Sequence, residues 1–161
     1  MSTLVIEDYA AIYQPAFEQL NKSWLTKYFR LEPIDEYVLT QPQEAIIDKG
    51  GAILVALFDD IPAGVVALRK VDNDTYEFTK MAVDEQFHRN GIAKALSYAA
   101  FDKVRKLGGK NIILFSHTSL QPAIALYRKL GFTEVPMDAL NEYVRSDIKM
   151  EIQLEEMVSK F

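Results

Sequence analysis

The 161-residue chain is expected to fold as one domain of mixed α/β (α+β) class, with helices packed on a mostly antiparallel sheet. Three observations predict this class. The apolar residues follow a helical period both before and after the middle of the chain. Three β-prone runs joined by short turns lie in the middle. Neither a repeat nor a composition break marks a linker. The predicted order is a strand, two helices, three antiparallel strands, a helix, a strand, a helix and two strands.

The first part of the chain is predicted to be mainly helical. Thr3–Ile6 is a short β-prone run. Between Tyr9 and Phe29 apolar residues recur every three to five positions, as on one face of a helix, and Pro15 marks either the start of that helix or a bend in it. A second, shorter helical region covers Asp35–Ile47 and is interrupted by Pro42.

The middle of the chain is predicted to be an antiparallel meander. Its strands are Ala52–Phe58, Gly64–Val71 and Thr75–Val83, and turn-forming residues at 59–62 and 72–74 separate them.

After the meander the period becomes helical again. A long amphipathic stretch is stopped by two glycines, and a second, shorter helix is followed directly by Gly131, the residue type that most often ends a helix. The remaining predicted elements are a helix at Gly91–Leu107, a strand at Asn111–Phe115, a helix at Pro122–Leu130, strands at Phe132–Val135 and Ser146–Leu154, and a loop at Pro136–Arg145.

Composition excludes several classes of function. The chain has no cysteine, which excludes disulfides, thiolate metal sites and an acyl-cysteine intermediate, and no metal site is expected. Its net charge of −5 does not suit binding to nucleic acid. No apolar run approaches the length of a membrane span, and the first residues lack the charge order of a signal peptide. A cytoplasmic protein that binds neither nucleic acid nor membrane is therefore expected.

The segment 81–96 is the first candidate site. A β-rich run leads through a polar loop into a helix, and the unpaired N–H groups of a first helical turn attract phosphate. Gly91 and Ala93 are small enough for close approach, and Arg89 and Lys94 add positive charge. From this segment alone a plain strand–loop–helix junction is as good an interpretation. The Gly-Lys-Ser/Thr of a nucleotide-binding P-loop is missing, and the preceding meander also does not fit such a protein.

A second motif decides between these interpretations. Residues 123–132 read AIALYRKLGF, and residues 88–93 read HRNGIA. Together they make the chain similar to the GNAT superfamily of coenzyme A-dependent acyltransferases, whose pyrophosphate motif is Arg or Gln, two residues, Gly, one residue, then Gly or Ala. The resemblance is strong from Gly51 to Phe132. It departs from the family pattern at His88, which replaces the Arg or Gln, and at Leu120, where the family often has Asn.

The resemblance implies the fold and the co-substrate. The family fold is a central, mostly antiparallel sheet of about seven strands with about four flanking helices. Acetyl-CoA is the implied co-substrate, and the implied chemistry is direct transfer of the acetyl group to an amine without an acyl-enzyme. The pantetheine arm would pair with free backbone groups of one strand, and the phosphates with the following loop and helix. The implied binding residues are Met81, Ala82, Val83, His88, Arg89, Asn90, Gly91, Ile92, Ala93, Lys94 and Tyr127.

Three residues are candidates for proton transfer. By the resemblance, Tyr127 matches the tyrosine that protonates the departing thiolate, although an aromatic on the core face of a helix is the alternative. Glu77 is the candidate base for the attacking amine, because strand alternation is expected to place it on one face with Thr79, Met81 and Val83. A solvated sheet residue or a partner for Lys80 is an equal alternative for Glu77, and His117 is the rival base.

The resemblance also implies that the acceptor site lies between the N-terminal helices and the 136–145 loop. Aromatic residues with a nearby carboxylate suit a cationic amine that carries an apolar body, although Trp24 and Phe29, each taken alone, are better explained as core residues. A small-molecule amine is preferred, the alternatives being a protein amine or a non-catalytic acyl-CoA sensor, and a homodimer is possible for this family. The expected acceptor residues are Trp24, Tyr28, Phe29, Glu32 and Tyr143.

Overall fold

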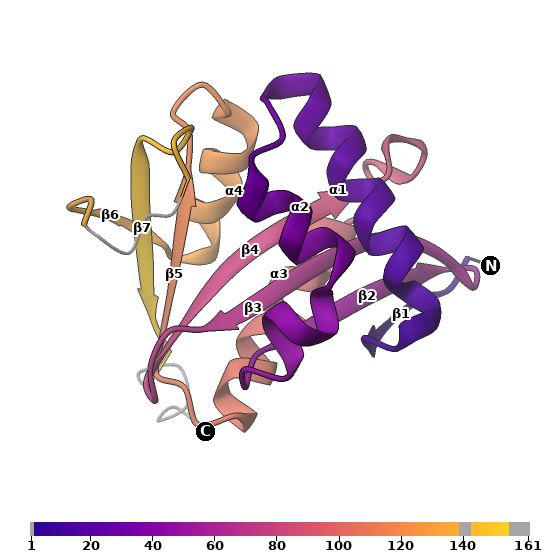
Figure 1. Cartoon of the computed structure of the whole chain (residues 1–161), viewed down its shortest axis with the longest axis horizontal. Helices are drawn as coiled ribbons and strands as arrows, with labels where there is room; N and C mark the ends of the chain where they lie inside the picture. Colours follow the sequence, from indigo (N-terminus) through magenta and orange to yellow (C-terminus); the bar gives the residue numbers. More distant parts are fainter. Residues whose placement is uncertain (1, 139–142, 155–161) are drawn as a thin grey trace.

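The computed structural model describes residues 2–138 and 143–154, so residues 139–142 of the predicted 136–145 loop lie outside the described residues. Within these ranges the chain forms one sheet of seven strands and four α-helices (Figure 1). This is the predicted class and the predicted order of elements. The strands are β1 Leu4–Asp8, β2 Ala52–Phe58, β3 Ile61–Lys70, β4 Thr75–Val83, β5 Asn111–Ser116, β6 Thr133–Val135 and β7 Ile148–Gln153. The helices are α1 Gln14–Tyr28, α2 Pro33–Thr40, α3 Ile92–Lys106 and α4 Gln121–Leu130.

The sheet order is β1-β2-β3-β4-β5-β7-β6. The predicted meander forms β2, β3 and β4, which pair antiparallel, and β1 adds to its outer edge. Only the β4–β5 pair is parallel, and α3 makes the crossover between these two strands. Because α3 connects two parallel strands, the loop after β4 leads directly into the start of α3.

The first two helices begin and end at other residues than the periodicity predicts. A 3-10 turn at Ala11–Tyr13 precedes α1, and Pro15 stands in the first turn, where its missing N–H costs nothing. Helix α2 begins at Pro33 and ends before Pro42, beyond which a π-helical turn follows. Its start is fixed by a capping box in which the backbone N–H of Glu32 donates to Asp35 at 2.9 Å.

Two apolar layers cover the two faces of the sheet. Alternate residues of β2 and β3 enter different layers: Val66 and Leu68 pack with α3 and α4, whereas Val65 and Ala67 pack with α1 and α2. Figure 1 shows α1 and α2 in front of the sheet and α3 behind it. Both faces of the central strands are therefore buried, which explains their continuous apolar sequence.

A bulge in β4 reverses the alternation of its side chains. Lys80 has a φ of +56°, and the pairing with β3 shifts between Val65 and Ala67. Beyond the bulge Met81 packs in the α3 layer, while Lys80 bonds to Asp35 of α2. The prediction that Glu77, Thr79, Met81 and Val83 share one face is therefore wrong, because strict alternation does not cross a bulge.

Strands β4 and β5 separate soon after they meet. Their register covers only Thr75–Glu77 against Asn111–Ile113, although β4 continues to Val83 and β5 to Ser116. Figure 1 shows the two strands diverging toward α4. The facing backbone groups of the later part of β4 therefore have no partner strand on that side.

Candidate active site

Two connected hollows occupy the opening between β4 and β5. The inner cavity, of about 90 Å³, lies between the two strands and the C-terminal half of α1. The outer groove, of about 710 Å³, runs between β4 and α4 toward the start of α3. Both are lined by Trp24, Met81, Ala123 and Tyr127, so these four residues mark the junction of the two hollows.

The outer groove ends at a loop built to present backbone N–H groups. The carboxylate of Asp84 accepts a hydrogen bond of 2.9 Å from the N–H of Gln86, which starts a 3-10 turn at Glu85–Phe87. Arg89 and Gly91 then take left-handed conformations, with φ of +69° and +73°, and Gly91 is the N-cap of α3. The first N–H groups of α3 lack intrahelical partners, as in any α-helix, and they favour an anion at this end of the groove.

Some of the predicted cofactor residues line the outer groove, and the others are buried in the core or exposed outside the groove. Those that line the groove are Met81, Ala82, Val83, His88, Ala93 and Tyr127. Ile92 is buried in the core, and Asn90 folds the loop by donating to the carbonyl of Phe87 at 2.9 Å. Arg89, Gly91 and Lys94 are exposed at the loop and the first turn of α3, without lining the groove.

His88 replaces the family's Arg or Gln but takes part in the groove. Its Nε2 lies 3.2 Å from the carbonyl oxygen of Val83, at the end of β4. The His88 ring therefore contacts the end of β4, the strand expected to pair with the pantetheine arm. The other departure, Leu120, is the N-cap of α4 and makes no side-chain cap.

Tyr127 stands at the junction of the two hollows. Its ring contacts Phe78 and Phe132 edge-on, with centroids 6.0 and 5.9 Å apart, and these contacts fix its position on α4. Its hydroxyl has no hydrogen-bond partner among the residues that the structure describes. Burial raises the pKa of Tyr127 to about 12, so the phenol keeps its proton at any physiological pH.

Glu77 does not line either hollow. Its side chain is 4% exposed, and it accepts a hydrogen bond of 2.7 Å from Nε of Arg69, its cross-strand partner on β3. The carboxylate lies in the part of β4 still paired with β5, before the opening. Its burial fits a base, but the carboxylate is engaged in an ion pair with Arg69 on the face of the sheet that α2 covers.

His117, the rival base, does line the inner cavity. Its ring meets Phe29 edge-on at 5.7 Å between centroids. Nδ1 accepts from the backbone N–H of Ser119 at 3.1 Å, which assigns the ring proton to Nε2, 3.5 Å from a carboxylate oxygen of Asp147. His117 is thus an oriented imidazole at the mouth of the cavity.

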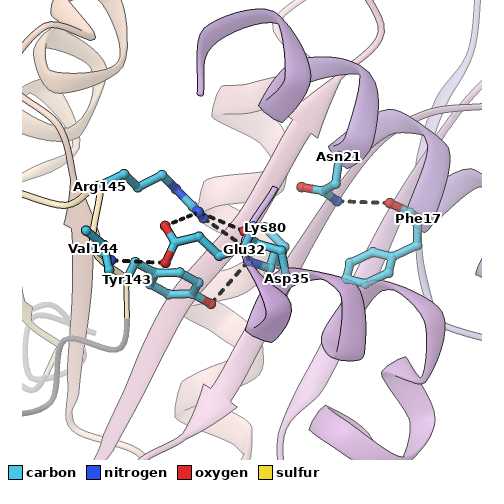
Figure 2. A network of polar contacts seen from close by, with 8 residues as sticks. All are labelled: Phe17, Asn21, Glu32, Asp35, Lys80, Tyr143, Val144 and Arg145. Carbon is cyan, nitrogen blue, oxygen red and sulfur yellow. Dashed lines mark hydrogen bonds and ion pairs between the residues drawn. The ribbon is translucent and has the colours of Figure 1, made fainter. Parts of the chain in front are cut away.

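Of the predicted acceptor residues, Trp24, Phe29 and Tyr143 line the inner cavity, and Tyr28 lines the outer groove. Glu32 lines neither. Its carboxylate accepts hydrogen bonds from the N–H of Val144 at 3.1 Å and from Arg145 at 2.9 Å, as Figure 2 shows. The expected carboxylate for a cationic acceptor is therefore already occupied by the protein.

Sequence reasoning missed a buried polar network that borders the inner cavity. Asp35 receives Lys80 at 2.5 Å and both terminal nitrogens of Arg145, at 2.7 and 2.9 Å (Figure 2). The hydroxyl of Tyr143 lies 3.1 Å from Nζ of Lys80. These residues are far apart in the sequence and follow no motif, so no local signal connects them.

Two features are absent from residues 2–138 and 143–154. No group of three or more His, Cys, Asp or Glu side chains in these ranges is arranged to hold a metal ion. None of the helices in the same ranges has the length and apolar character needed to cross a bilayer.

Comparison with known proteins agrees with the fold. The family model described as "Acetyltransferase (GNAT) family" matches residues 7–132. The chain is 31% identical over 133 residues to the uncharacterized N-acetyltransferase YvbK of Bacillus subtilis, which covers 79% of this chain and 86% of that protein. The residues matched by the family model include the loop and the α4 motif described above.

Solved structures resemble the chain over nearly its whole length. An acetyltransferase of the GNAT family from Staphylococcus aureus Mu50 superposes with a TM-score of 0.86 at 18% identity, over 95% of this chain and 100% of that one. The PaiA N-acetyltransferase of Thermoplasma acidophilum, solved in complex with coenzyme A, superposes with a TM-score of 0.75 at 17% identity, over 94% and 99% of the two chains. At these identities the likeness is one of fold.

Proposed function

Because the chain belongs to the GNAT acetyltransferase family, we propose that it moves an acetyl group from acetyl-CoA to the amine of a small molecule by direct attack. One observation carries the proposal. The parting of β4 from β5 leads from a long groove into a small cavity, and Tyr127 stands where the two meet.

The outer groove suits coenzyme A. The unpaired edge of β4 at residues 81–83 offers backbone groups to the amides of a pantetheine arm, as a sheet edge does to an added strand. The start of α3 offers N–H groups to the pyrophosphate, and the small Ala93 side chain leaves room for close approach. The PaiA structure, which contains coenzyme A, shares this fold and supports the same assignment here.

The inner cavity then receives the acceptor. The nitrogen of the neutral amine attacks the acetyl carbonyl carbon, and the carbon–sulfur bond breaks as the new amide bond forms. Tyr127 donates its proton to the departing thiolate, and backbone N–H groups near Val83 stabilise the charge on the carbonyl oxygen. A phenol with a pKa of about 12 is always protonated when the thiolate leaves.

The amine must lose a proton before or during attack. We assign this proton to Nδ1 of His117, directly or through a water that replaces the hydrogen bond from Ser119 at this atom, because His117 lines the inner cavity and Glu77 does not. Glu77 in turn neutralises Arg69, in the part of β4 that is still paired with β5. Asn21 lines the same cavity; its amide nitrogen donates to the carbonyl of Phe17 at 3.0 Å, which leaves its carbonyl oxygen to accept from the amine (Figure 2).

The size of the inner cavity supports a small acceptor. About 90 Å³ is space for several water molecules, and therefore for a ligand of few heavy atoms. A lysine side chain of a protein is the alternative acceptor, and a sensor that binds acetyl-CoA without turnover is the alternative function.

The first experiment is a thiol-release assay. The purified protein is mixed with acetyl-CoA and a panel of amino acids, polyamines, aralkylamines, aminoglycosides and a lysine peptide. Release that depends on one small-amine class supports the proposal, and release with the peptide alone supports the protein-acetyltransferase alternative. Silence across the panel, with acetyl-CoA still raising the melting temperature, supports the sensor. A radiolabelled acetyl group that stays on the protein and is later passed to the amine contradicts direct attack.

A further inference from the structure

The inner cavity has a cationic wall. Lys80 and Arg145 line it, and no Asp or Glu is among the described residues that do. The carboxylates that neutralise these cations, Asp35 and Glu32, bind them from outside the lining. A ligand in the cavity therefore meets the positive ends of these ion pairs first.

The two cations are held close together in a fixed arrangement. Nζ of Lys80 lies 4.4 Å from the centroid of the Tyr143 ring, and Cζ of Arg145 lies 4.5 Å from the same centroid. Asp35 grips Arg145 with both carboxylate oxygens, which fixes the plane of the guanidinium (Figure 2). Both side chains are already held in place before a ligand binds, so little conformational entropy is lost on binding.

Both cations keep N–H groups for a ligand. Of the five N–H donors of Arg145, three bond to Glu32 and Asp35, and Nε is not among them. Lys80 uses two of its three, on Asp35 and the hydroxyl of Tyr143. Neither cation makes a further hydrogen bond to the described residues. The remaining donors match an anion with two oxygens.

We propose that the acceptor is a small amino acid, whose carboxylate binds Arg145 and Lys80 while its amine lies at the Met81 and Tyr127 end of the inner cavity. This inference rests on the proposed function. Lys80 and Met81 are consecutive in β4 and both line the inner cavity, so one small ligand can reach from one residue to the other. The apolar residues Trp24, Leu25 and Phe29 line the side of the cavity next to the ligand's side chain.

Matched acceptors test the proposal on the unaltered protein. L-Alanine, L-leucine and L-phenylalanine are each compared with their carboxamide and their decarboxylated amine, at equal concentrations of the neutral amine. We expect kcat/KM for at least one acid to exceed that of both its neutral relatives by about ten-fold or more. Equal or better turnover of the amides or amines overturns the proposal. The phosphonate analogue of alanine separates a carboxylate site from a general anion site, and its preference over every acid also overturns the proposal.

A binding readout separates this inference from the proposed function. The melting temperature of the protein saturated with coenzyme A is measured with each acid and each amide. A larger increase with the acids, without any thiol release, supports the carboxylate site and contradicts the acetyltransferase assignment. Equal increases, or none with any of these ligands, contradict the carboxylate site whatever the turnover.

Variants locate the carboxylate. Arg145→Gln should reduce the preference for acid over amide to less than about two-fold, and Arg145→Lys should restore only part of it, because an ammonium cannot make the paired contact. Arg128→Gln is the matched control, since Arg128 pairs with Glu134 on the surface, away from both hollows. An unchanged preference in a folded Arg145→Gln protein overturns the assignment. If this variant does not fold, the matched acceptors decide.

Discussion

Asp35, at the start of α2, and Lys80, at the bulge of β4, form an ion pair of 2.5 Å between side chains that are 0% and 3% exposed. The pair joins the helical layer to the one residue of β4 with a left-handed backbone. A non-glycine residue in that conformation costs about 1–2 kcal/mol, so the contact with Asp35 has to offset it. The bulge in turn decides which side chains of β4 face the α3 layer and which face α2.

Removing one partner of this pair should be strongly destabilising. Asp35→Asn leaves Lys80 and Arg145 buried without their shared carboxylate, and we expect the free energy of unfolding to fall by about 3–5 kcal/mol. Urea unfolding followed by circular dichroism measures it. The matched control is Glu18→Gln, which breaks the Glu18–Lys22 pair on the surface of α1 and should cost roughly 0.5 kcal/mol. Equal losses in the two variants would show that burial adds nothing to the Asp35 pair.

The same carboxyl should make stability depend on pH in acid. Burial alone would raise the pKa of Asp35, but its bonds to Arg145 and Lys80 outweigh burial and hold the pKa below the ordinary 3.8. The unfolded state therefore takes up the proton first as the pH falls. Stability from this group is present above about pH 3.8 and is lost as the pH falls through the lower folded pKa.

Comparison with Asp35→Asn isolates this contribution. Urea midpoints of wild type and variant should differ most at neutral pH and converge as the pH falls well below 3.8. A constant difference over that range would mean that another group carries the acid sensitivity.

The sequence predicted the parts of this fold that depend on local pattern. The order of elements, the meander and the helix ended by Gly131 follow from periodicity and turn residues. The α4 motif singled out Tyr127, which lines the inner cavity in the structure. Each of these signals lies within a short window of the chain. A window of that length is enough to detect them without knowledge of packing.

The parts that failed depend on long-range contacts. The side on which Glu77 lies was inferred from strict alternation, and the bulge at Lys80 is stabilised by Asp35, 45 residues away in the sequence. Arg145 joins the same network from a separation of 110 residues. No propensity or spacing rule connects three such positions, so the cationic wall of the inner cavity could be recognised only once the chain was folded.

The assignment of the base can be tested by substituting two residues separately: His117, which lines the inner cavity, and Glu77, which does not. His117→Gln should lower kcat by about 10²-fold, because a positioned proton acceptor at the inner cavity is lost. Glu77→Gln should leave kcat close to that of wild type and lower the melting temperature, because the buried ion pair with Arg69 is lost. The opposite pattern, with turnover lost in the Glu77 variant alone, would restore Glu77 as the base acting through water.

Tyr127→Phe tests the acid. The hydroxyl has no hydrogen-bond partner among the described residues, so its removal should leave folding and coenzyme A affinity unchanged while kcat falls by about 10²–10⁴-fold. Stopped thiol-release assays give kcat, and calorimetry gives the affinity. Tyr98→Phe, on the exposed side of α3, is the matched control and should change neither.

Because the pKa of Tyr127 is about 12, wild-type kcat should also show no loss near pH 10, where an ordinary phenol ionises. Undiminished turnover in Tyr127→Phe would assign the proton on the leaving thiolate to water, and a loss of wild-type kcat near pH 10 would mean that the tyrosine ionises as if it were exposed.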